Sequence, residues 1–334
     1  MVAVEFLTTS GSSLDARTSK LLLDLEKVEA VGDPQVSANH AQVNLNDGSI
    51  VSFDGDFVAL QLALQFGDSE ALFLALPSIR IDSISKSFSG GDSVLVTGLG
   101  ITGDELAPFF SEDAIEGGFQ HFLRGNDTFV GDLGQESLAG FAGNDIILGM
   151  NGNDSIEGGA GDDELNGNKG VDVVDGGPDR DFARGGQESD LVLGGDGDDW
   201  HLNGNNANDT VQGGNGADAV FGGREDDLLQ GQDGNDFLSG DLGNDVLVGG
   251  IGADVFAFDH NSGLDFVFDF RPEDGDRIGI RTDANGVLLR NGTDVISRAL
   301  QAEEGTVLDL GNENYVLLDF FQRADLRAEH FVLF

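Results

Sequence analysis

The chain has 334 residues, of which 61 are Asp or Glu and 17 are Lys or Arg, and its formal net charge is −44 at pH 7. This charge excludes nucleic acids and anionic membrane surfaces as partners, because a protein binds either of them through a basic surface of its own. The sequence also lacks a run of about 20 apolar residues, the length that a membrane-spanning helix needs, so no membrane insertion is expected. It has no cysteine, and residues 1 to 10 have neither the basic start nor the apolar core of a secretory signal peptide.

Residues 1 to 98 are predicted to form a small, mainly-β region whose role the sequence does not indicate. The clearest signal is a strand at 42 to 45, a turn at Asn46-Asp47-Gly48 and a second strand at 50 to 53. An Asp-Gly pair between two apolar runs is typical of a β-hairpin. Antiparallel strands are therefore expected in this region.

Residues 99 to 121 are predicted to cap the region that follows them. A stack of short strands without a cap would expose a sheet edge and one end of an apolar core. Thr102 or Asp104 is expected to begin a short helix that closes this end, because Thr and Asp are favoured at helix N-termini.

A nine-residue unit of the form G-G-x-G-x-D-x-U-x, in which U is a large apolar residue, recurs fifteen times between residues 122 and 257. Clear copies begin at Gly194, Gly213 and Gly249. The sixth position is Asp in every unit except one, where Glu136 replaces it. The aspartates at this position are Asp127, Asp145, Asp154, Asp163, Asp172, Asp181, Asp190, Asp199, Asp209, Asp218, Asp227, Asp236, Asp245 and Asp254.

The eighth position of the unit is a large apolar residue in all but two copies. In those two copies we place Ala183 and His201 at the eighth position. Apolar residues nine apart cannot line one face of a helix, whereas a three-residue strand x-U-x directs its middle side chain to one side. Such short strands are stable only when other strands pair with them on both sides, so the units must stack. The sequence therefore predicts an all-β solenoid of stacked nonapeptide repeats, with two units in each coil.

Stacking places the aspartates in columns, where carboxylates repel each other unless a cation lies between successive turns. The candidate ligands are all oxygen atoms, and an all-oxygen set selects a hard ion. Loosely built sites with several carbonyl ligands favour Ca²⁺ over Mg²⁺, which requires stricter octahedral geometry. We therefore expect several Ca²⁺ ions, held by the position-six aspartates together with turn glycines. These glycines are Gly143, Gly152, Gly161, Gly195, Gly197, Gly214, Gly216, Gly234, Gly243 and Gly250.

Departures from the repeat cluster in its middle. The usual glycine at position four is replaced by Asp179, Glu188, Ala207 and Glu225. Asn203 is interpreted as an extra residue that breaks the nine-residue phase, and the neighbouring Trp200, the only tryptophan, is expected to cover a bulge. Calcium sites between residues 176 and 212 are therefore expected to be weaker or lost.

The repeat closely resembles the nonapeptide of the RTX, or hemolysin-type calcium-binding, proteins. This resemblance implies a parallel β-roll in which the turns of units n and n+2 sandwich each calcium ion. The run from Asp265 to Phe270, followed by Pro272 to Ile278, is similar to the D-F-x-x-G-x-D-x-I segment that follows RTX rolls in proteins exported by type I secretion. The end of the chain is similar to the C-terminal export signal of that class. Residues 258 to 334 are thus expected to form a C-terminal β cap that carries a type I secretion signal.

These features favour a secreted calcium-binding protein with a structural or adhesive role at the cell surface. Its expected partners are calcium, the type I secretion machinery, and a cell-surface polysaccharide or protein. The alternative is a secreted enzyme, or an accessory module of one such as a polysaccharide-modifying enzyme, with a site in residues 1 to 98. The sequence has no H-E-x-x-H or G-x-S-x-G motif, and its five histidines stand alone. No catalytic residue is therefore assigned.

Overall fold

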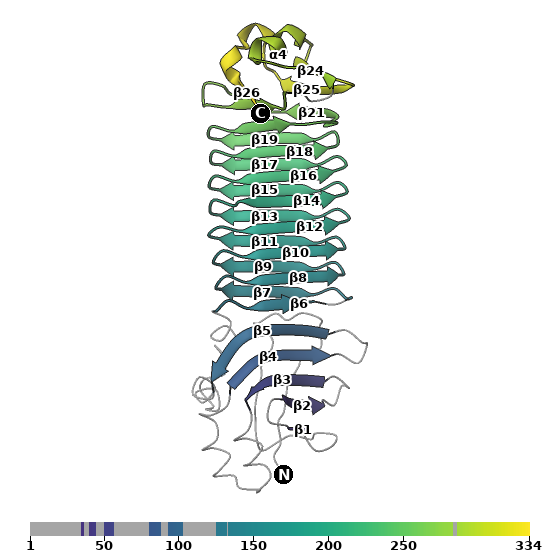
Figure 1. Ribbon diagram of the computed structural model, residues 1–334, viewed down its shortest axis with the longest axis vertical. Helices are drawn as coiled ribbons and strands as arrows, with labels where there is room; N and C mark the ends of the chain where they lie inside the picture. Colours follow the sequence, from purple (N-terminus) through teal and green to yellow (C-terminus); the bar gives the residue numbers. More distant parts are fainter. Residues whose placement is uncertain are drawn as a thin grey trace. The chain divides into compact units, whose positions relative to one another are not determined.

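The computed structural model describes the backbone of five strands between residues 35 and 102, and both main and side chains of residues 125 to 131, 133 to 282 and 286 to 334. The chain divides into two compact units, Met1–Gly152 and Asn153–Phe334. Figure 1 shows that strands dominate the described residues of both units. Among the described residues, no helix has the length and apolar character needed to cross a membrane.

The first unit begins with antiparallel strands. Its strands are β1 (Gln35–Val36), β2 (His40–Asn44), β3 (Ile50–Asp56), β4 (Arg80–Ser87), β5 (Ser93–Thr102), β6 (Thr128–Val130), β7 (Ser137–Ala142) and β8 (Ile146–Asn151). Strands β1 to β5 pair in chain order, each antiparallel to the next. Val43 lies opposite Val51, which confirms the hairpin predicted around Asn46-Asp47-Gly48.

The antiparallel strands of this unit join a parallel ladder. Val96 of β5 lies opposite Phe129 of β6 in an antiparallel pair, and Phe129 lies opposite Ile147 of β8 in a parallel pair. The edge of β6 is therefore covered by β5, which removes a row of unpaired backbone groups. The short helix expected to begin at Thr102 or Asp104 falls mainly on residues 103 to 124, which lie outside the described residues.

The second unit contains most of the repeats and the end of the chain. Its strands are β9 (Ser155–Ala160), β10 (Glu164–Lys169), β11 (Val173–Pro178), β12 (Phe182–Gln187), β13 (Leu191–Asp196), β14 (His201–Asn206), β15 (Thr210–Asn215), β16 (Ala219–Arg224), β17 (Leu228–Asp233), β18 (Phe237–Leu242), β19 (Val246–Ile251), β20 (Val255–Phe258), β21 (Leu264–Val267), β22 (Arg277–Ile280), β23 (Leu300–Gln301), β24 (Gly305–Gly311), β25 (Asn314–Asp319) and β26 (Phe331–Leu333). The helical segments described here are α4 (Gly292–Arg298), η6 (Arg323–Asp325) and η7 (Ala328–His330).

Strands β9 to β20 alternate between two sheets, and each pairs in parallel with the strand two places later (Figure 1). Val174 of β11 lies opposite Ile156 of β9 and Val192 of β13, so one coil contains two nonapeptides. All three side chains are at most 1% exposed. The position-eight residues therefore fill the interior between the two sheets, and the predicted all-β parallel β-roll is confirmed.

The break in the nine-residue phase lies at Trp200, so the assignments of Asn203 as the extra residue and of His201 as the core residue are wrong. Leu202 lies opposite Ala183 in the ladder between β12 and β14, and Asn203 continues that ladder. Leu202 is fully buried, whereas His201 lies on the outer face. Pairing keeps the larger apolar side chain of Leu202 in the core, and Trp200 therefore bulges out at the start of the strand, with 54% of its surface exposed.

Parallel pairing continues past residue 257. Val267 of β21 lies opposite Leu247 of β19, and Ile278 of β22 lies opposite Phe256 of β20. Strands β25 and β26 extend the same two ladders, and the antiparallel pair β24–β25 and helix α4 complete the end of the unit. The N-cap of α4 is Asn291, whose side chain accepts hydrogen bonds from the first turn.

Candidate metal centre

Each position-six aspartate lies between a glycine-rich turn and the strand that follows, and from Asp172 to Asp254 its Oδ1 atom accepts a hydrogen bond from the backbone of the preceding coil. The backbone nitrogen of Asp172 lies 2.8 Å from Asp190 Oδ1, and that of Asp181 lies 2.8 Å from Asp199 Oδ1. The same contact recurs between other pairs of stacked aspartates at 2.7 to 2.9 Å. The backbone thus fixes each carboxylate in a column along the stack.

From Asp172 to Asp245 the second oxygen of each position-six carboxylate is buried and accepts no hydrogen bond. The Oδ2 atoms that accept no hydrogen bond include those of Asp172, Asp181, Asp190, Asp199, Asp209, Asp218, Asp227, Asp236 and Asp245. A buried acceptor without a donor costs about 1–3 kcal/mol, and a charged one costs more. Columns of such oxygens are therefore stable only with protons or with a cation beside them.

Burial raises the pKa of these carboxyl groups, because it disfavours the charged form. Burial raises the pKa of Asp190 to about 8. The hydrogen bond from the Asp172 amide lowers this pKa, and neighbouring carboxylates raise it further. The pKa of Asp227 also reaches about 8, and that of Asp199 reaches about 6, for the same leading cause. A bound cation would favour the charged form and lower these pKa values.

Main-chain oxygens of the turns lie close to the same carboxylates. A Cβ atom added to Gly234 would overlap the Gly216 carbonyl oxygen of the previous coil and would lie 2.9 Å from Asp236 Oδ1. Gly216 itself has φ 136°, in the region that favours glycine, and a Cβ atom added there would overlap the Gly197 carbonyl oxygen. Glycine is therefore required at these positions, and it lets a turn carbonyl and a carboxylate meet at one place.

The oxygen atoms gathered here fit calcium. Within the described part of the chain, no group of three or more His, Cys, Asp or Glu side chains could hold a metal ion, so an ion in the turns must take carbonyl oxygens as well. Ca²⁺ accepts such mixed sets of carboxylate and carbonyl oxygens in flexible geometry. Of the predicted glycine ligands, those with positive φ are Gly143, Gly152, Gly161, Gly195, Gly197, Gly214, Gly216 and Gly250. A Cβ atom added to Gly234 or Gly243 would overlap a carbonyl oxygen of the preceding coil, as it would at Gly216.

The turns that lack the position-four glycine also have a positive φ there, but a smaller one than the 136° of Gly216. Their φ angles are 83° at Asp179, 72° at Glu188, 83° at Ala207 and 70° at Glu225. A left-handed residue other than glycine costs roughly 1–2 kcal/mol, and two side chains help to offset it. The Oε2 atoms of Glu188 and Glu225 accept hydrogen bonds from backbone nitrogens of the preceding coil, each at 3.0 Å. Weaker calcium binding between residues 176 and 212 stays a prediction.

Two further aspartates extend the columns, and the nonapeptide pattern did not identify them. The backbone nitrogen of Asp245 lies 3.1 Å from Asp265 Oδ1, and that of Asp254 lies 3.0 Å from Asp276 Oδ1. The spacings are 20 and 22 residues, because the loops before β21 and β22 are longer than the usual turn. Each aspartate still begins a D-x-U triplet that ends at a fully buried apolar residue, and that triplet is the sequence signal that could have found them.

Asp269 accepts hydrogen bonds from the backbone of β19 at the end of the roll. Its Oδ1 and Oδ2 atoms accept from the backbone nitrogens of Gly249 and Gly250, both at 2.8 Å. Both oxygens therefore have donors from the last complete turns of the roll, unlike the position-six carboxylates.

The Asp269→Ala variant is expected to lose about 3 kcal/mol of stability in saturating calcium, because hydrogen bonds to a charged group contribute about 1.5–3 kcal/mol each. Thermal unfolding followed by circular dichroism would measure the loss. The matched control is Asp274→Ala, which removes an exposed carboxylate from the same loop. Equal melting temperatures for the two variants would contradict a closing role for Asp269.

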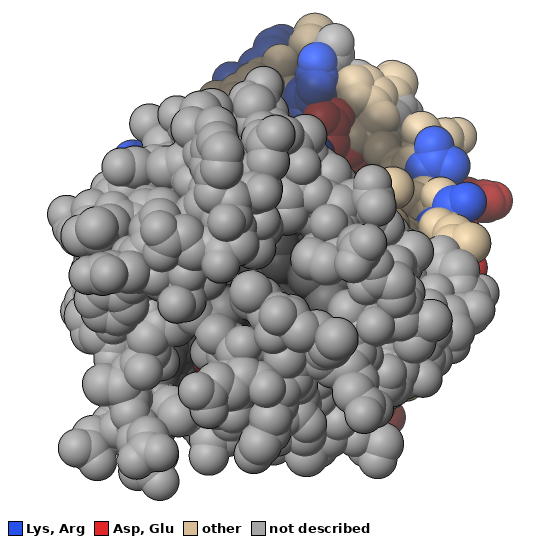
Figure 2. Space-filling model, turned by 90° about the horizontal axis from the view of Figure 1, so that it is seen from below, with Lys and Arg blue, Asp and Glu red and all other residues tan. Residues whose placement is uncertain are grey.

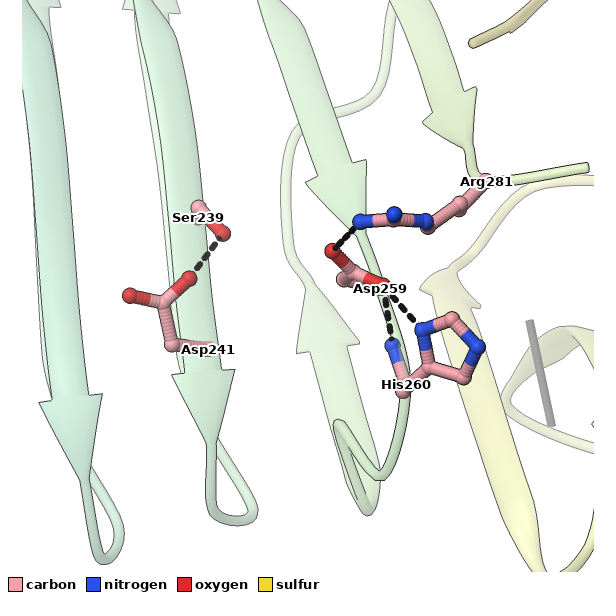
Figure 3. A network of polar contacts seen from close by, with 5 residues as sticks. All are labelled: Ser239, Asp241, Asp259, His260 and Arg281. Atoms are coloured by element: carbon pink, nitrogen blue, oxygen red, sulfur yellow. Dashed lines mark hydrogen bonds and ion pairs between the residues drawn. The ribbon is translucent and has the colours of Figure 1, made fainter. Parts of the chain in front are cut away.

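A second polar cluster, shown in Figure 3, lies near the ends of β18, β20 and β22. Asp259 pairs with His260 Nδ1 at 2.6 Å and with Arg281 Nη1 at 2.9 Å, and the Ser239 hydroxyl donates to Asp241 Oδ1 at 2.7 Å. Burial opposes ionisation of Asp259, but the hydrogen bonds from Arg281 and His260 hold its pKa below the usual value. The exposed Asp259 pairs connect the loop after β20 to the end of β22.

Comparison with known proteins identifies the repeats. The family model of the RTX calcium-binding nonapeptide repeat matches four times, at residues 139–174, 175–200, 201–229 and 221–256. No curated protein matches the chain.

Two solved structures match part of the chain. The AlgE6R3 subunit of the mannuronan C5-epimerase from Azotobacter vinelandii is 24% identical, with a TM-score of 0.26, over 52% of this chain and 80% of that one. The extracellular lipase LipA from Serratia marcescens is 17% identical, with a TM-score of 0.26, over 60% of this chain and 38% of the lipase. The matched repeats and the parallel coils together assign residues 139 to 256 to the RTX calcium-binding nonapeptide repeats, folded as a β-roll.

Proposed function

We propose that this is an exported protein whose roll folds when it binds extracellular calcium, and whose role at the cell surface is structural or adhesive. The observation that carries the proposal is the set of buried Oδ2 atoms without donors along the stacked turns. A calcium ion beside each pair of turns would neutralise the carboxylates and complete their coordination. The position-six aspartates and the turn glycines named above would hold these ions.

Calcium concentration supports an extracellular site of action. Modules of this type outside cells bind calcium with dissociation constants of about 0.1 to 1 mM. At millimolar calcium each such site adds on the order of 1 kcal/mol of stability, and in the cytosol it adds almost nothing. Several stacked sites together would therefore switch the roll from unfolded to folded as the chain leaves the cell.

The ends of the chain are assigned roles within this proposal. Residues 258 to 334 would serve as a C-terminal cap and type I secretion signal, residues 99 to 121 as an N-terminal cap, and residues 122 to 257 as the calcium-binding roll. Residues 1 to 98 form the mainly-β N-terminal region, where an effector or an unrecognised site would lie. The resemblance of residues 265 to 278 to the segment that follows RTX rolls supports the export assignment.

Titration of calcium into the full-length chain, starting in excess chelator, tests the proposal. We expect the far-ultraviolet circular dichroism signal of β structure to rise steeply over roughly 0.1–1 mM free calcium. Magnesium at the same concentration should have a much smaller effect, because it gives up its water ligands reluctantly. A chain with full β signal in chelator, or with an equal response to magnesium, would show that calcium does not build the roll.

A further inference from the structure

One outer face of the roll carries a continuous row of aromatic side chains, the aromatic stripe, formed by Phe182, Trp200, His201, Phe221 and Phe237. Ring centroids lie 4.8 Å apart between Phe182 and His201, 4.8 Å between His201 and Phe221, and 5.8 Å between Phe221 and Phe237. Trp200 lies 4.7 Å from Phe182. The stripe therefore crosses β12, β14, β16 and β18, which are consecutive neighbours in one sheet (Figure 1), with Phe221 two residues along its strand from the row of Phe182, His201 and Phe237.

Cross-strand stacking alone does not account for this stripe. Paired aromatic residues on neighbouring strands stabilise a sheet by about 0.2–1 kcal/mol each, which suits Phe182 and Phe221. Trp200, however, is an added residue in a bulge, and 54% of its surface is exposed. Bulges are enriched beside functional sites, where they redirect a side chain. The bulge and the stacked rings are two separate observations that point to the same face.

The polar groups beside the stripe include hydrogen-bond donors and one carboxylate residue, Glu164, which lies opposite Phe182 at the end of the stripe. The Arg184 guanidinium lies 4.2 Å from the centre of the Phe182 ring, and Asn203 lies opposite Arg184 in the ladder. Burial and the charge of Arg184 lower the pKa of His201, so its ring is neutral at pH 7. The stripe thus presents ring faces beside donor groups, a combination that suits a ligand with an apolar face and polar edges.

Charge decides between the ligands that stack on aromatic rings. Single-stranded nucleic acids need a basic channel beside the rings, whereas this chain has a net charge of −44. On the face seen in Figure 2, the Lys and Arg side chains of the described residues lie among Asp and Glu side chains. A second copy of the chain would bring two strongly acidic surfaces together. A neutral sugar ring has an apolar C–H face and hydroxyl edges, and it meets no repulsion.

We propose that the aromatic stripe binds a neutral, linear polysaccharide, whose sugar rings stack on Trp200, Phe221 and Phe237 while their hydroxyl groups bond to Arg184 and Asn203. The inference rests on the proposed calcium-folded roll and gives its adhesive role a ligand class. The row of rings on successive strands matches a chain-like ligand, because each strand advances the stack by about 4.8 Å.

Trp200 is the only tryptophan, so its fluorescence reports on this face directly. The calcium-loaded full-length protein would be titrated with cellohexaose, maltohexaose, mannohexaose and xylohexaose. At least one of them is expected to change the emission of Trp200 and to bind in calorimetry. The Trp200→Ala and Phe221→Ala variants are expected to bind it about tenfold more weakly, the effect of losing one aromatic contact.

The matched control is Phe320→Ala, which removes a phenylalanine that is 82% exposed and lies outside the stripe. Its affinity should equal that of the wild type. Equal losses in Phe320→Ala and Phe221→Ala, or a folded roll that binds none of the four hexaoses, would overturn the proposal. Tighter binding of polygalacturonate or of single-stranded DNA, or self-association in sedimentation that Trp200→Ala abolishes, would also overturn it. A chain without calcium-dependent circular dichroism would instead count against the proposed function.

Discussion

The Asp218→Asn variant is expected to be less stable than the wild type in saturating calcium, and at least as stable in excess chelator. Asp218 Oδ1 accepts a hydrogen bond from the Asp199 backbone at 2.9 Å, and its Oδ2 atom is buried without a donor. An amide oxygen can keep the first contact, but it carries no charge for a metal ion. The substitution therefore separates the structural role of the side chain from its role as a calcium ligand.

The two conditions give opposite signs because the carboxylate has a partner in only one of them. With calcium bound, removing one charge from a buried pair costs about 3–5 kcal/mol. In chelator the same change removes a buried charge whose pKa is already raised to about 7, chiefly by burial, so the folded state loses an unfavourable group. Urea unfolding curves in saturating calcium, and the circular dichroism signal of β structure in excess chelator, would measure the two opposite effects in both proteins.

Asp233→Asn is the matched control, since it removes the same charge from an exposed position. Its stability should change by less than about 0.5 kcal/mol in either condition, as is usual for surface substitutions. If Asp218→Asn lost equal stability with and without calcium, its carboxylate would be a structural acceptor only.

The repeat made the roll predictable, because each coil contacts only the coils before and after it. A sequence that places an apolar residue and an aspartate at fixed positions in every unit therefore specifies the whole stack. Ile156, Val174 and Val192 all lie in the predicted core. Sequence reasoning worked where one local rule repeats without interruption.

The same reasoning failed where the local rule changes. Counting in nines places His201 in the core, whereas strand pairing selects Leu202, the larger apolar side chain. Asp265 and Asp276 were missed because their loops are longer than the repeat, although their ladder contacts are the same. The register between strands is set by packing in three dimensions. The rings of the aromatic stripe come together only because of this register.

The sequence predicted least about the structure of the residues before 125. A hairpin signal was sufficient to place β2 and β3, because turn chemistry is local. The pairing of β5 with β6 joins residues 93 to 102 to the first repeat, and no local motif in the sequence predicted it. Long-range antiparallel pairing of this kind is decided by which edges are left uncovered.

In excess chelator, the chain is expected to gain β structure as the pH is lowered from about 8 to about 5. Burial raises the pKa of Asp181 and Asp190 to about 8 and that of Asp245 to about 7 in the folded roll, against an ordinary value of 3.8 for each. In this range the folded state binds more protons than the unfolded state, so its stability rises as the pH falls. Each unit of pKa difference corresponds to about 1.4 kcal/mol for one group.

Saturating calcium should remove this dependence. A bound cation stabilises the charged carboxylates and holds their pKa below the value in the unfolded chain, so that both states stay ionised between pH 5 and 8, and acid displaces the ion and weakens the fold only below about pH 4. Circular dichroism between pH 5 and 8 would follow both cases, with the free calcium concentration fixed at each pH. Asp190→Asn, which cannot titrate, should flatten the chelator curve, whereas Asp274→Asn at an exposed position should leave it unchanged. A metal-free chain that lost β structure on acidification would mean that the columns are not held apart by charge, and the need for calcium would require another cause.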